Sequence, residues 1–406
     1  MTVWHVYPLG FLDAPIRPTG KATLEHRLVD LIPWLGYAAG LGCDALSLGP
    51  VFASTSHGYD TVDYERIDPR LGDESDLSAL LRAAHDAGLA VYLDGVFNHA
   101  GREHPLFAGA LAGGDWHPDR RLFAWDARGP RYFEGHEGLP EWNHDSPEVA
   151  TMVERIMRTW LARGIDGWRL DAAYATPPAF WAGVLPGVRA AFPKAYVFAE
   201  MIHGDYAGFV RSSGVDATTQ YELWKAIWSS LVSVNFFELR WALQRHAALL
   251  ETFAPVTFVG NHDTDRIASQ VGPHRVPLAL AILLTVGGSP HLYYGDERGL
   301  TGTKGSGRAA DDPLRPAYPR SPADLPADGA WLADLTRQLV HLRRERPWLE
   351  RATTRITDLT CARLAYTSSA RDDTSLSLDV VCDLSDATHP SCAVTDAHGP
   401  LFAYRA

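Results

Sequence analysis

The sequence Gly167-Trp168-Arg169-Leu170-Asp171-Ala172-Ala173-Tyr174 combines a strand pattern with two charged side chains at its end. Because side chains alternate between the two faces of a strand, Arg169 and Asp171 are expected to point the same way. A buried aspartate beside a fixed guanidinium is expected to keep a low pKa, so that it is ionised and can act as a nucleophile. A purely structural Arg–Asp pair at a strand end is the alternative interpretation.

On both sides of this stretch, strand-like apolar segments alternate with amphipathic helix-like segments, which is typical of parallel βα units. Two helices are well marked, at residues 76–87 and at 147–163, the second with Ser146 and Pro147 at its start. Eight parallel strands in a chain of 406 residues favour a closed (β/α)₈ TIM barrel over an open doubly wound sheet. The strand candidates are residues 4–9, 44–48, 90–94, 167–171, 195–199, 217–221, 256–260 and 290–294.

Two segments depart from this alternation. Residues 100–145 are rich in Gly, Pro, Trp and His and are too long for an ordinary βα loop, so we expect a small inserted domain after the third strand. Residues 348–406 show short alternating runs, which predict a small C-terminal antiparallel β domain. The barrel is then expected over residues 1–99 and 146–347.

Composition excludes several classes of partner. With 37 basic and 49 acidic residues the net charge is −12, which argues against nucleic acid and against an anionic membrane surface. The longest apolar run, residues 276–286, is far too short to span a membrane and predicts a buried helix. No secretory leader pattern precedes the first strand, so we expect a cytoplasmic protein. Free thiols are the default for the four cysteines, although Cys382 and Cys392 would be able to pair in an exported protein.

Barrel enzymes carry their chemistry where the strands run into the following loops. Three carboxylates arrive there from three strands, namely Asp171, Glu200 and Asp263. Retaining glycoside hydrolysis needs a nucleophilic carboxylate and a proton-donating carboxyl about 5–5.5 Å apart. Asp171 suits the nucleophile, whereas Glu200 has no adjacent cation in the sequence, so desolvation should raise its pKa and suit it for general acid/base catalysis. Asp263 would stabilise positive charge in the transition state.

The strand ends also supply polar and aromatic side chains that suit a sugar. His99 and His262 would donate to sugar hydroxyls, and Tyr59 would stack under the ring, although an isolated histidine is more often satisfied by a backbone carbonyl. The candidate substrate-binding residues are Tyr59, Asp60, His99, Arg169, His203 and His262. Within the insertion, Trp116, Trp125 and Trp142 are either core residues or sugar platforms.

Four segments at these strand ends resemble, in order, spacing and strand context, the four sequence regions of the α-amylase family, glycoside hydrolase family 13. They are Asp94-Gly95-Val96-Phe97-Asn98-His99, Gly167-Trp168-Arg169-Leu170-Asp171, Phe198-Ala199-Glu200 and Phe258-Val259-Gly260-Asn261-His262-Asp263. The resemblance implies a (β/α)₈ barrel with a small domain B after strand three and a β domain C at the end. It also implies retaining chemistry on α-glucosidic bonds, with Asp171 as nucleophile, Glu200 as acid/base and Asp263 as transition-state stabiliser.

The resemblance implies further sites and shows departures. Asp312 and Arg315 lie where relatives bind the next sugar on the non-reducing side, and many relatives hold calcium through the residue equivalent to Asn98. No other cofactor is implied. Starch-endo-acting relatives often carry a Lys-His pair where this chain has Tyr174-Ala175, so we do not expect an efficient endo-amylase. Residues 139–143 match neither common version of the family's fifth region, which leaves the linkage preference open.

The sequence therefore predicts a retaining enzyme that cleaves α-glucosidic bonds in short malto- or related oligosaccharides. A transglycosylase that passes the glucosyl group to a sugar acceptor would use the same carboxylates, because the two activities differ in acceptor-site shape and water access. A non-catalytic family member is a third alternative, although such proteins typically lose a catalytic carboxylate. The oligomeric state stays open.

Overall fold

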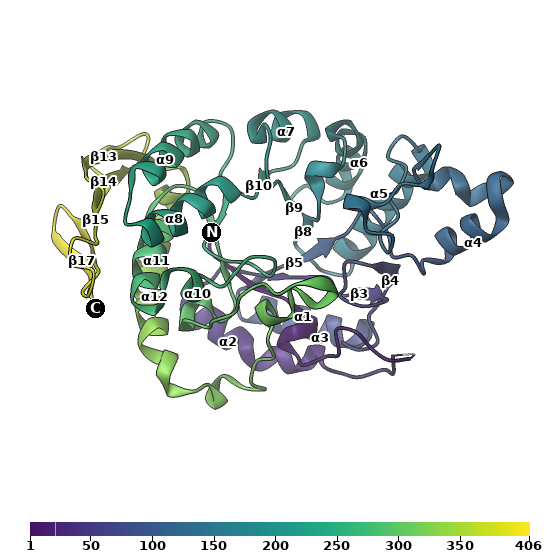
Figure 1. The fold of residues 1–406 in the computed structure, drawn as a ribbon, viewed down its shortest axis with the longest axis horizontal. Helices are drawn as coiled ribbons and strands as arrows, with labels where there is room; N and C mark the ends of the chain where they lie inside the picture. Colours follow the sequence, from purple (N-terminus) through teal and green to yellow (C-terminus); the bar gives the residue numbers. More distant parts are fainter. Residues whose placement is uncertain (21) are drawn as a thin grey trace.

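A closed barrel of parallel strands forms the centre of the computed structural model, which describes residues 1–20 and 22–406. The strands are β1 (Val3–Val6), β2 (Ala45–Leu48), β5 (Ala90–Gly95), β8 (Gly167–Leu170), β9 (Tyr196–Ala199), β10 (Ala217–Thr218), β11 (Val256–Phe258) and β12 (Ser289–Tyr293). They pair in the order β10-β9-β8-β5-β2-β1-β12-β11, and a parallel bridge between Thr219 and Val256 joins the two edges. Helices surround the strands (Figure 1), which confirms the predicted barrel.

The helices follow the strands as the apolar periodicity predicts. The side chain of Asp73 caps α3 (Glu74–Asp86), and every residue of α11 (Val276–Thr285) is buried, as its unbroken apolar sequence predicts. The remaining barrel helices are α1 (Pro8–Phe11), α2 (Ile32–Leu41), α5 (Pro147–Ala162), α6 (Pro178–Ala191), α7 (Tyr206–Ser213), α8 (Tyr221–Ser233), α9 (Phe237–Leu250), α10 (Ile267–Val271) and α12 (Ala330–Arg344). Within the described residues, no helix is both long enough and apolar enough to cross a membrane.

The start of α5 departs from its predicted capping. Ser146 occupies the position before the helix, but its hydroxyl donates to the Glu148 carboxylate (2.8 Å) and makes no bond to a backbone N–H of the first turn. The short 3₁₀ helices are η1 (Leu28–Leu31), η2 (Gly114–Trp116), η3 (Pro118–Leu122), η4 (Phe133–Gly135), η5 (Ala173–Ala175), η6 (Pro273–Arg275), η7 (Asp296–Arg298), η8 (Gly307–Ala309), η9 (Asp312–Leu314), η10 (Pro322–Asp324), η11 (Ala327–Gly329) and η12 (Pro347–Arg351).

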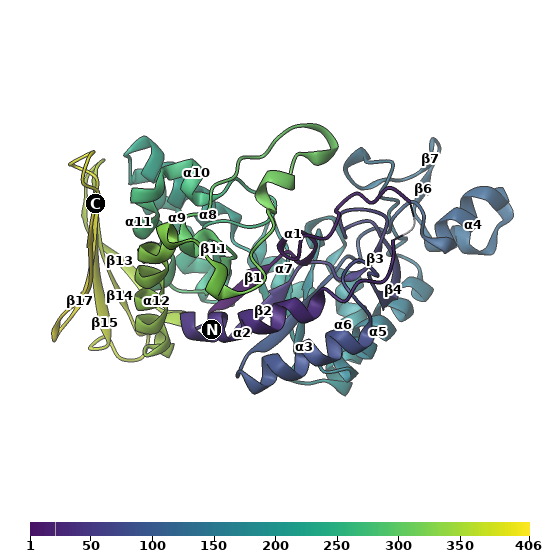
Figure 2. The ribbon, with the colours of Figure 1, turned by 90° about the horizontal axis from the view of Figure 1, so that it is seen from below.

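Residues 100–145 form a lobe that projects from one end of the molecule (Figures 1 and 2). It contains α4 (Pro105–Gly113) and the paired strands β6 (Trp125–Asp126) and β7 (Gly129–Pro130). Trp142 is buried and stacks on Phe123 at 4.4 Å, so it belongs to the core of the lobe, whereas Trp116 is 96% exposed. A second, unpredicted excursion is the hairpin of β3 (Phe52–Ser54) and β4 (Thr61–Ile67).

A five-stranded antiparallel sheet lies at the opposite end of the molecule (Figure 2). Its strands are β13 (Thr353–Leu359), β14 (Arg363–Ser369), β15 (Ser377–Asp383), β16 (Ser391–Asp396) and β17 (Gly399–Arg405). The sheet is anchored to the barrel by a hydrogen bond of 2.6 Å between the hydroxyls of Tyr366 and Thr285, the latter on α11. Cys382 and Cys392 face each other across β15 and β16, and both are buried free thiols.

A buried carboxyl just after β12 gives the stability of the fold a pH dependence. Glu297 is 0% exposed, and its carboxyl accepts hydrogen bonds from the Tyr37 hydroxyl (3.0 Å) and the Gly295 N–H (2.8 Å). Burial raises the pKa of Glu297 from 4.5 to about 7. Between these two values the folded protein holds a proton that the unfolded chain has released, so the stability contributed by Glu297 falls as the pH rises through this window.

We expect Glu297→Gln to flatten this pH dependence. The loss of unfolding free energy between pH 5 and pH 8 should be smaller in the variant than in the native protein by about 2 kcal/mol. Denaturant unfolding at pH 5, 6, 7 and 8 measures the difference, with Asp334→Asn on the exposed face of α12 as the control. Parallel stability curves for the native protein and Glu297→Gln would contradict the prediction.

Candidate active site

Arg169, on β8, holds a buried group of carboxylates at the carboxyl ends of neighbouring barrel strands. Its Nη1 donates to both oxygens of Asp94 (2.8 and 2.7 Å) and to Asp171 Oδ1 (3.0 Å). Its Nη2 lies 2.8 Å from Glu200 Oε1. All four side chains are buried. We call these four residues the Arg169 cluster, in which one guanidinium faces three carboxylates.

The charges of this cluster correct two expectations from the sequence, namely the low pKa of Asp171 and the absence of a cation beside Glu200. Burial raises the pKa of Asp171 well above its ordinary range, Arg169 opposes the rise, and Glu200 and Asp94 add to it. Arg169 therefore does not keep the pKa of Asp171 low, as we expected from the sequence. The expectation that Glu200 lacks an adjacent cation is also wrong, because the same guanidinium contacts it. Burial likewise raises the pKa of Asp94 against the opposing charge of Arg169, so Asp94 and Asp171 both hold a proton more readily than a free aspartate does.

Glu200 is fixed in place by partners that the sequence did not indicate. The N–H of Ala172 donates to its Oε2 (3.0 Å), and the Tyr221 hydroxyl donates to its Oε1 (3.1 Å). Asn261 in turn donates to the Tyr221 hydroxyl (2.8 Å). Ala172, whose N–H binds Glu200, has a left-handed φ of 47°, a strained conformation for alanine. The turn that follows Asp171 therefore positions the carboxyl of the next strand.

Asp263, after β11, differs from the cluster in charge state and exposure. Its Oδ1 lies 2.7 Å from Arg315 Nη2 and its Oδ2 lies 3.0 Å from His262 Nε2. Burial alone would raise the pKa of Asp263, but His262, Arg315 and Arg169 lower it well below its ordinary value. The side chain is 34% exposed, so Asp263 is an ionised carboxylate that a ligand can reach.

Tyr59 and His262 connect Asp263 with the Arg169 cluster. The Tyr59 hydroxyl donates to Asp94 Oδ2 (3.1 Å) and also contacts His262 Nε2. Their rings are almost parallel, with centroids 5.3 Å apart. His262 Nδ1 contacts Nε2 of His5 (3.0 Å), whose pKa is lowered well below its ordinary value by burial and by His262 and Arg169. His5, from β1, was not singled out in the sequence because the motif around it carries no other polar signal.

Asp60 and His99 have other partners. Both oxygens of Asp60 accept hydrogen bonds from Ser56, from its N–H (3.0 Å) and its hydroxyl (2.6 Å). His99 Nε2 contacts the carbonyl oxygen of Tyr59 (3.0 Å), and its Nδ1 contacts the Asn98 amide (3.2 Å). Burial lowers the pKa of His99 to about 3, so the ring is neutral. The His99 ring is therefore bonded to a backbone carbonyl, which is the more common arrangement of an isolated histidine.

Within the described residues, the last three candidate binding residues form no hydrogen bond or ion pair with the Arg169 cluster. They are His203, Asp312 and Arg315. His203 is exposed, with its ring 5.6 Å from that of Tyr174. The Asp312 carboxylate is paired with Arg17. Arg315 is buried and holds Asp263, and its Nε also donates to the carbonyl oxygen of His262 (2.9 Å).

Asn98, the residue that the resemblance connects with calcium, is in contact with two neighbouring side chains. Calcium takes six to eight oxygen ligands. The Asn98 side-chain oxygen accepts from the Thr176 hydroxyl (3.4 Å), and its amide nitrogen faces a histidine nitrogen of His99. Asn98 supplies one oxygen atom of the kind that calcium binds, and calcium at this position stays a prediction.

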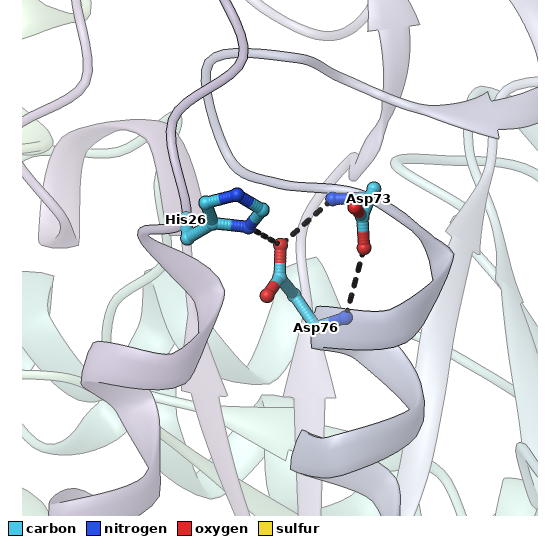
Figure 3. A group of neighbouring side chains, drawn as sticks. All are labelled: His26, Asp73 and Asp76. Atoms are coloured by element: carbon cyan, nitrogen blue, oxygen red, sulfur yellow. Dashed lines mark hydrogen bonds and ion pairs between the residues drawn. The ribbon is translucent and has the colours of Figure 1, made fainter.

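One group of His and Asp side chains elsewhere in the described residues is close enough to share an ion, namely His26, Asp73 and Asp76 (Figure 3). As the cap of α3, the Asp73 carboxylate accepts hydrogen bonds from the N–H groups of Ser75 and Asp76. The Asp76 carboxylate accepts a hydrogen bond from the Asp73 N–H (2.9 Å). The Asp76 carboxylate also contacts Nδ1 of His26 (2.7 Å). Helix capping accounts for this arrangement.

Comparison with known proteins gives the family. A model described as the alpha amylase catalytic domain matches residues 6–321. The chain is 33% identical over 303 residues to the cyclomaltodextrinase of Geobacillus thermopakistaniensis, with 70% of this chain and 51% of that protein covered. It is 32% identical over 298 residues to the 4-alpha-glucanotransferase of Thermotoga neapolitana, with 66% of each covered. The chain thus spans about half the length of several curated relatives.

A solved structure resembles the whole chain. The cyclic alpha-maltosyl-(1→6)-maltose hydrolase of Arthrobacter globiformis, in complex with maltose, superposes with a TM-score of 0.80 at 25% identity. The match covers 100% of this chain and 98% of that one. With the family model over most of the barrel and the carboxylates at the matching strand ends, the chain belongs to the α-amylase family.

Proposed function

We propose that the protein is a retaining glycoside hydrolase that cleaves α-glucosidic bonds in short malto- or related oligosaccharides. The observation that carries the proposal is the shared guanidinium, because Arg169 holds Asp171 and Glu200 together in one buried site with too few cations for three carboxylates. Two carboxyl groups held at one site are what retaining hydrolysis needs, one as the nucleophile and the other as the proton donor. The relatives named as cyclomaltodextrinase and cyclic maltosyl-maltose hydrolase support the choice of substrate class.

In the proposed reaction Asp171 is first the nucleophile and then the leaving group, and Glu200 is first the acid and then the base. Asp171 attacks the anomeric carbon while the bond to the leaving oxygen breaks and Glu200 gives that oxygen its proton. Glu200 then takes a proton from water as the water oxygen attacks the glycosyl–Asp171 ester and releases the Asp171 carboxylate. Asp263, ionised and partly exposed, stabilises the positive charge that develops on the sugar in both steps.

The experiment that tests this function incubates the purified protein with maltose, maltotriose, isomaltose, a cyclomaltodextrin and soluble starch, with product separation by chromatography. We expect release of short sugars from the small substrates and slow turnover of starch. Failure to turn over any of these substrates would overturn the proposal.

Transglycosylation is a second candidate, favoured by the similarity to 4-alpha-glucanotransferases. The structure adds a rim after Asp171 that joins the barrel to the lobe, where the Tyr174 hydroxyl donates to Glu134 (2.8 Å) and the Tyr174 ring lies 5.6 Å from that of His203. A rim of this kind can hold a sugar acceptor and limit access of water. Products longer than the substrate at high maltotriose concentration would identify this activity.

We expect Asp263→Asn to lower kcat by about 10²–10³-fold, because it removes a preorganised charge aimed at the transition state. KM should change much less, since the neutral amide keeps similar contacts with bound sugar. Asp265→Asn, two residues further along the same loop, is the control, because the Asp265 carboxylate accepts the N–H of Lys304, whereas Asp263 is paired with Arg315 and His262. Steady-state kinetics on maltotriose measures both variants, and equal losses in the two would contradict the assigned role of Asp263.

A further inference from the structure

A groove opens beside the Arg169 cluster, between the loop after β9 and helices α8 and α9. Its volume is about 530 Å³, within the range of sites that bind small molecules. We call it the α8–α9 groove and define it by Ile202, His203, Tyr221, Lys225, Trp241 and Arg245. None of these residues belongs to the Arg169 cluster.

Trp241 is the most informative side chain of the groove. It lies on α9 and is 63% exposed, and Ile202 on the opposite wall is 40% exposed. Large apolar side chains that remain exposed beside a groove mark ligand sites. An indole ring offers a flat apolar face together with an N–H donor, which suits the apolar face and hydroxyl rim of a sugar ring.

The charges of the groove favour a neutral ligand. Arg245 of α9 lies 2.7 Å from Glu222 of α8, and Lys225 of α8 is paired with Glu238 of α9. Two cations and two carboxylates cancel, so the groove does not attract an anionic or a cationic ligand. These side chains remain partly exposed, and their unused donors and acceptors can bond hydroxyl groups.

The groove is connected to the acid/base carboxyl through Tyr221. Tyr221, which donates to Glu200 Oε1, forms part of its wall, and Ile202 and His203 come two and three residues after Glu200 in the chain. Lys225 lies one turn of α8 beyond Tyr221, about 6 Å along the helix axis. Its partner Glu238 is three residues before Trp241. The groove therefore leads outward from the side of the site where Glu200 protonates the leaving sugar.

We propose that the α8–α9 groove binds the leaving-group end of a linear α-glucan chain, with Trp241 stacked on the third sugar ring of the leaving chain. This inference rests on the proposed function, which supplies the direction of cleavage. Binding of the leaving chain at Trp241 makes the enzyme more efficient on longer chains than on maltotriose, because the leaving part of maltotriose is too short to reach Trp241.

The test compares native protein, Trp241→Ala and Trp241→Phe on maltotriose and maltohexaose. We expect Trp241→Ala to lower kcat/KM on maltohexaose by about tenfold and to leave maltotriose within about twofold. Trp241→Phe should recover most of the loss, because it restores an aromatic face. Trp331→Ala, on α12 and 40% exposed, is the matched control and should change neither substrate.

The outcomes separate this inference from the proposed function. If the native protein is active and Trp241→Ala keeps the native ratio between the two substrates, the groove does not bind the leaving chain. If the native protein turns over neither substrate, the proposed function fails, and calorimetric titration of maltohexaose into Asp171→Asn and Asp171→Asn/Trp241→Ala decides about the groove. Affinity lost with Trp241 supports the site, and equal affinity, or no binding to either protein, overturns it.

Discussion

Asp171→Ala and Glu200→Ala will each lower kcat on maltotriose by about 10⁴-fold or more while the fold stays intact. Loss of either member of a pair of groups that act together removes most of the chemical acceleration. Circular dichroism and thermal melting of both variants verify folding. Native-like turnover in either variant would contradict the assignment of that residue.

Azide distinguishes the two roles. With α-glucosyl fluoride, whose leaving group needs no proton, Glu200→Ala should still form the glycosyl ester on Asp171, and azide should release α-glucosyl azide. In Asp171→Ala, azide should enter the space of the missing carboxylate and give β-glucosyl azide by direct displacement. The opposite pairing of products and variants would exchange the roles of the two carboxylates.

Arg169→Met will destabilise the protein by about 3–5 kcal/mol at pH 8, because it leaves the three buried carboxylates without their shared cation. Removal of the cation raises the folded-state pKa values of Asp94 and Asp171 further above their unfolded values, because burial raises both of them in the native protein and Arg169 opposes the rise. Such groups bind more protons in the folded state, so the loss should be larger at pH 8 than at pH 5. Denaturant unfolding at the two pH values measures it.

Two further variants test whether the loss of stability in Arg169→Met comes from the loss of the shared cation. Adding Asp94→Asn to Arg169→Met should recover part of the stability at pH 8. In the native protein both oxygens of Asp94 bind Nη1 of Arg169, so without Arg169 the Asp94 carboxylate is an unpaired buried charge. The amide removes this charge. Arg363→Met removes an arginine that pairs with two carboxylates on the partly exposed surface of the C-terminal sheet, and should cost less than about 1 kcal/mol. Equal losses for Arg169→Met and Arg363→Met would show that the cluster is not held by its shared cation.

The sequence predicted the barrel well because its strands are short apolar runs set between marked helices. All eight predicted strand segments overlap strands of the sheet, and the apolar run at 276–286 is the buried helix α11. Regular periodicity is a local property, so it can be recognised without knowledge of the folded structure. The hairpin of β3 and β4 was missed because its strands lie within what looked like a single βα loop.

The site was predictable in composition but not in its contacts. Strand ends of a barrel meet at one mouth, so Asp171, Glu200 and Asp263 could be grouped from the sequence alone. Their pKa values depend on which charges come close in space. Arg169 reaches Glu200 on the next strand as well as its near neighbour Asp171, and this could not be deduced from sequence spacing.

Contacts between distant segments account for the remaining surprises. Tyr221 holds Glu200 from the first turn of α8, and Glu134 reaches Tyr174 from the inserted lobe. Neither pairing has a local signal, because each joins two loops whose relative position is set by the packing of the whole barrel.

The central claim, a covalent glycosyl intermediate on Asp171, is tested most directly with 5-fluoro-α-glucosyl fluoride. The fluorine at C5 slows both steps, and the reactive leaving group keeps the first one faster, so the ester accumulates. Intact-protein mass spectrometry should show one added fluoroglucosyl group per chain, and peptide mapping should locate it on Asp171. An adduct on any other residue, or turnover of α-glucosyl fluoride to β-glucose as the first product, would contradict the retaining mechanism proposed for this site.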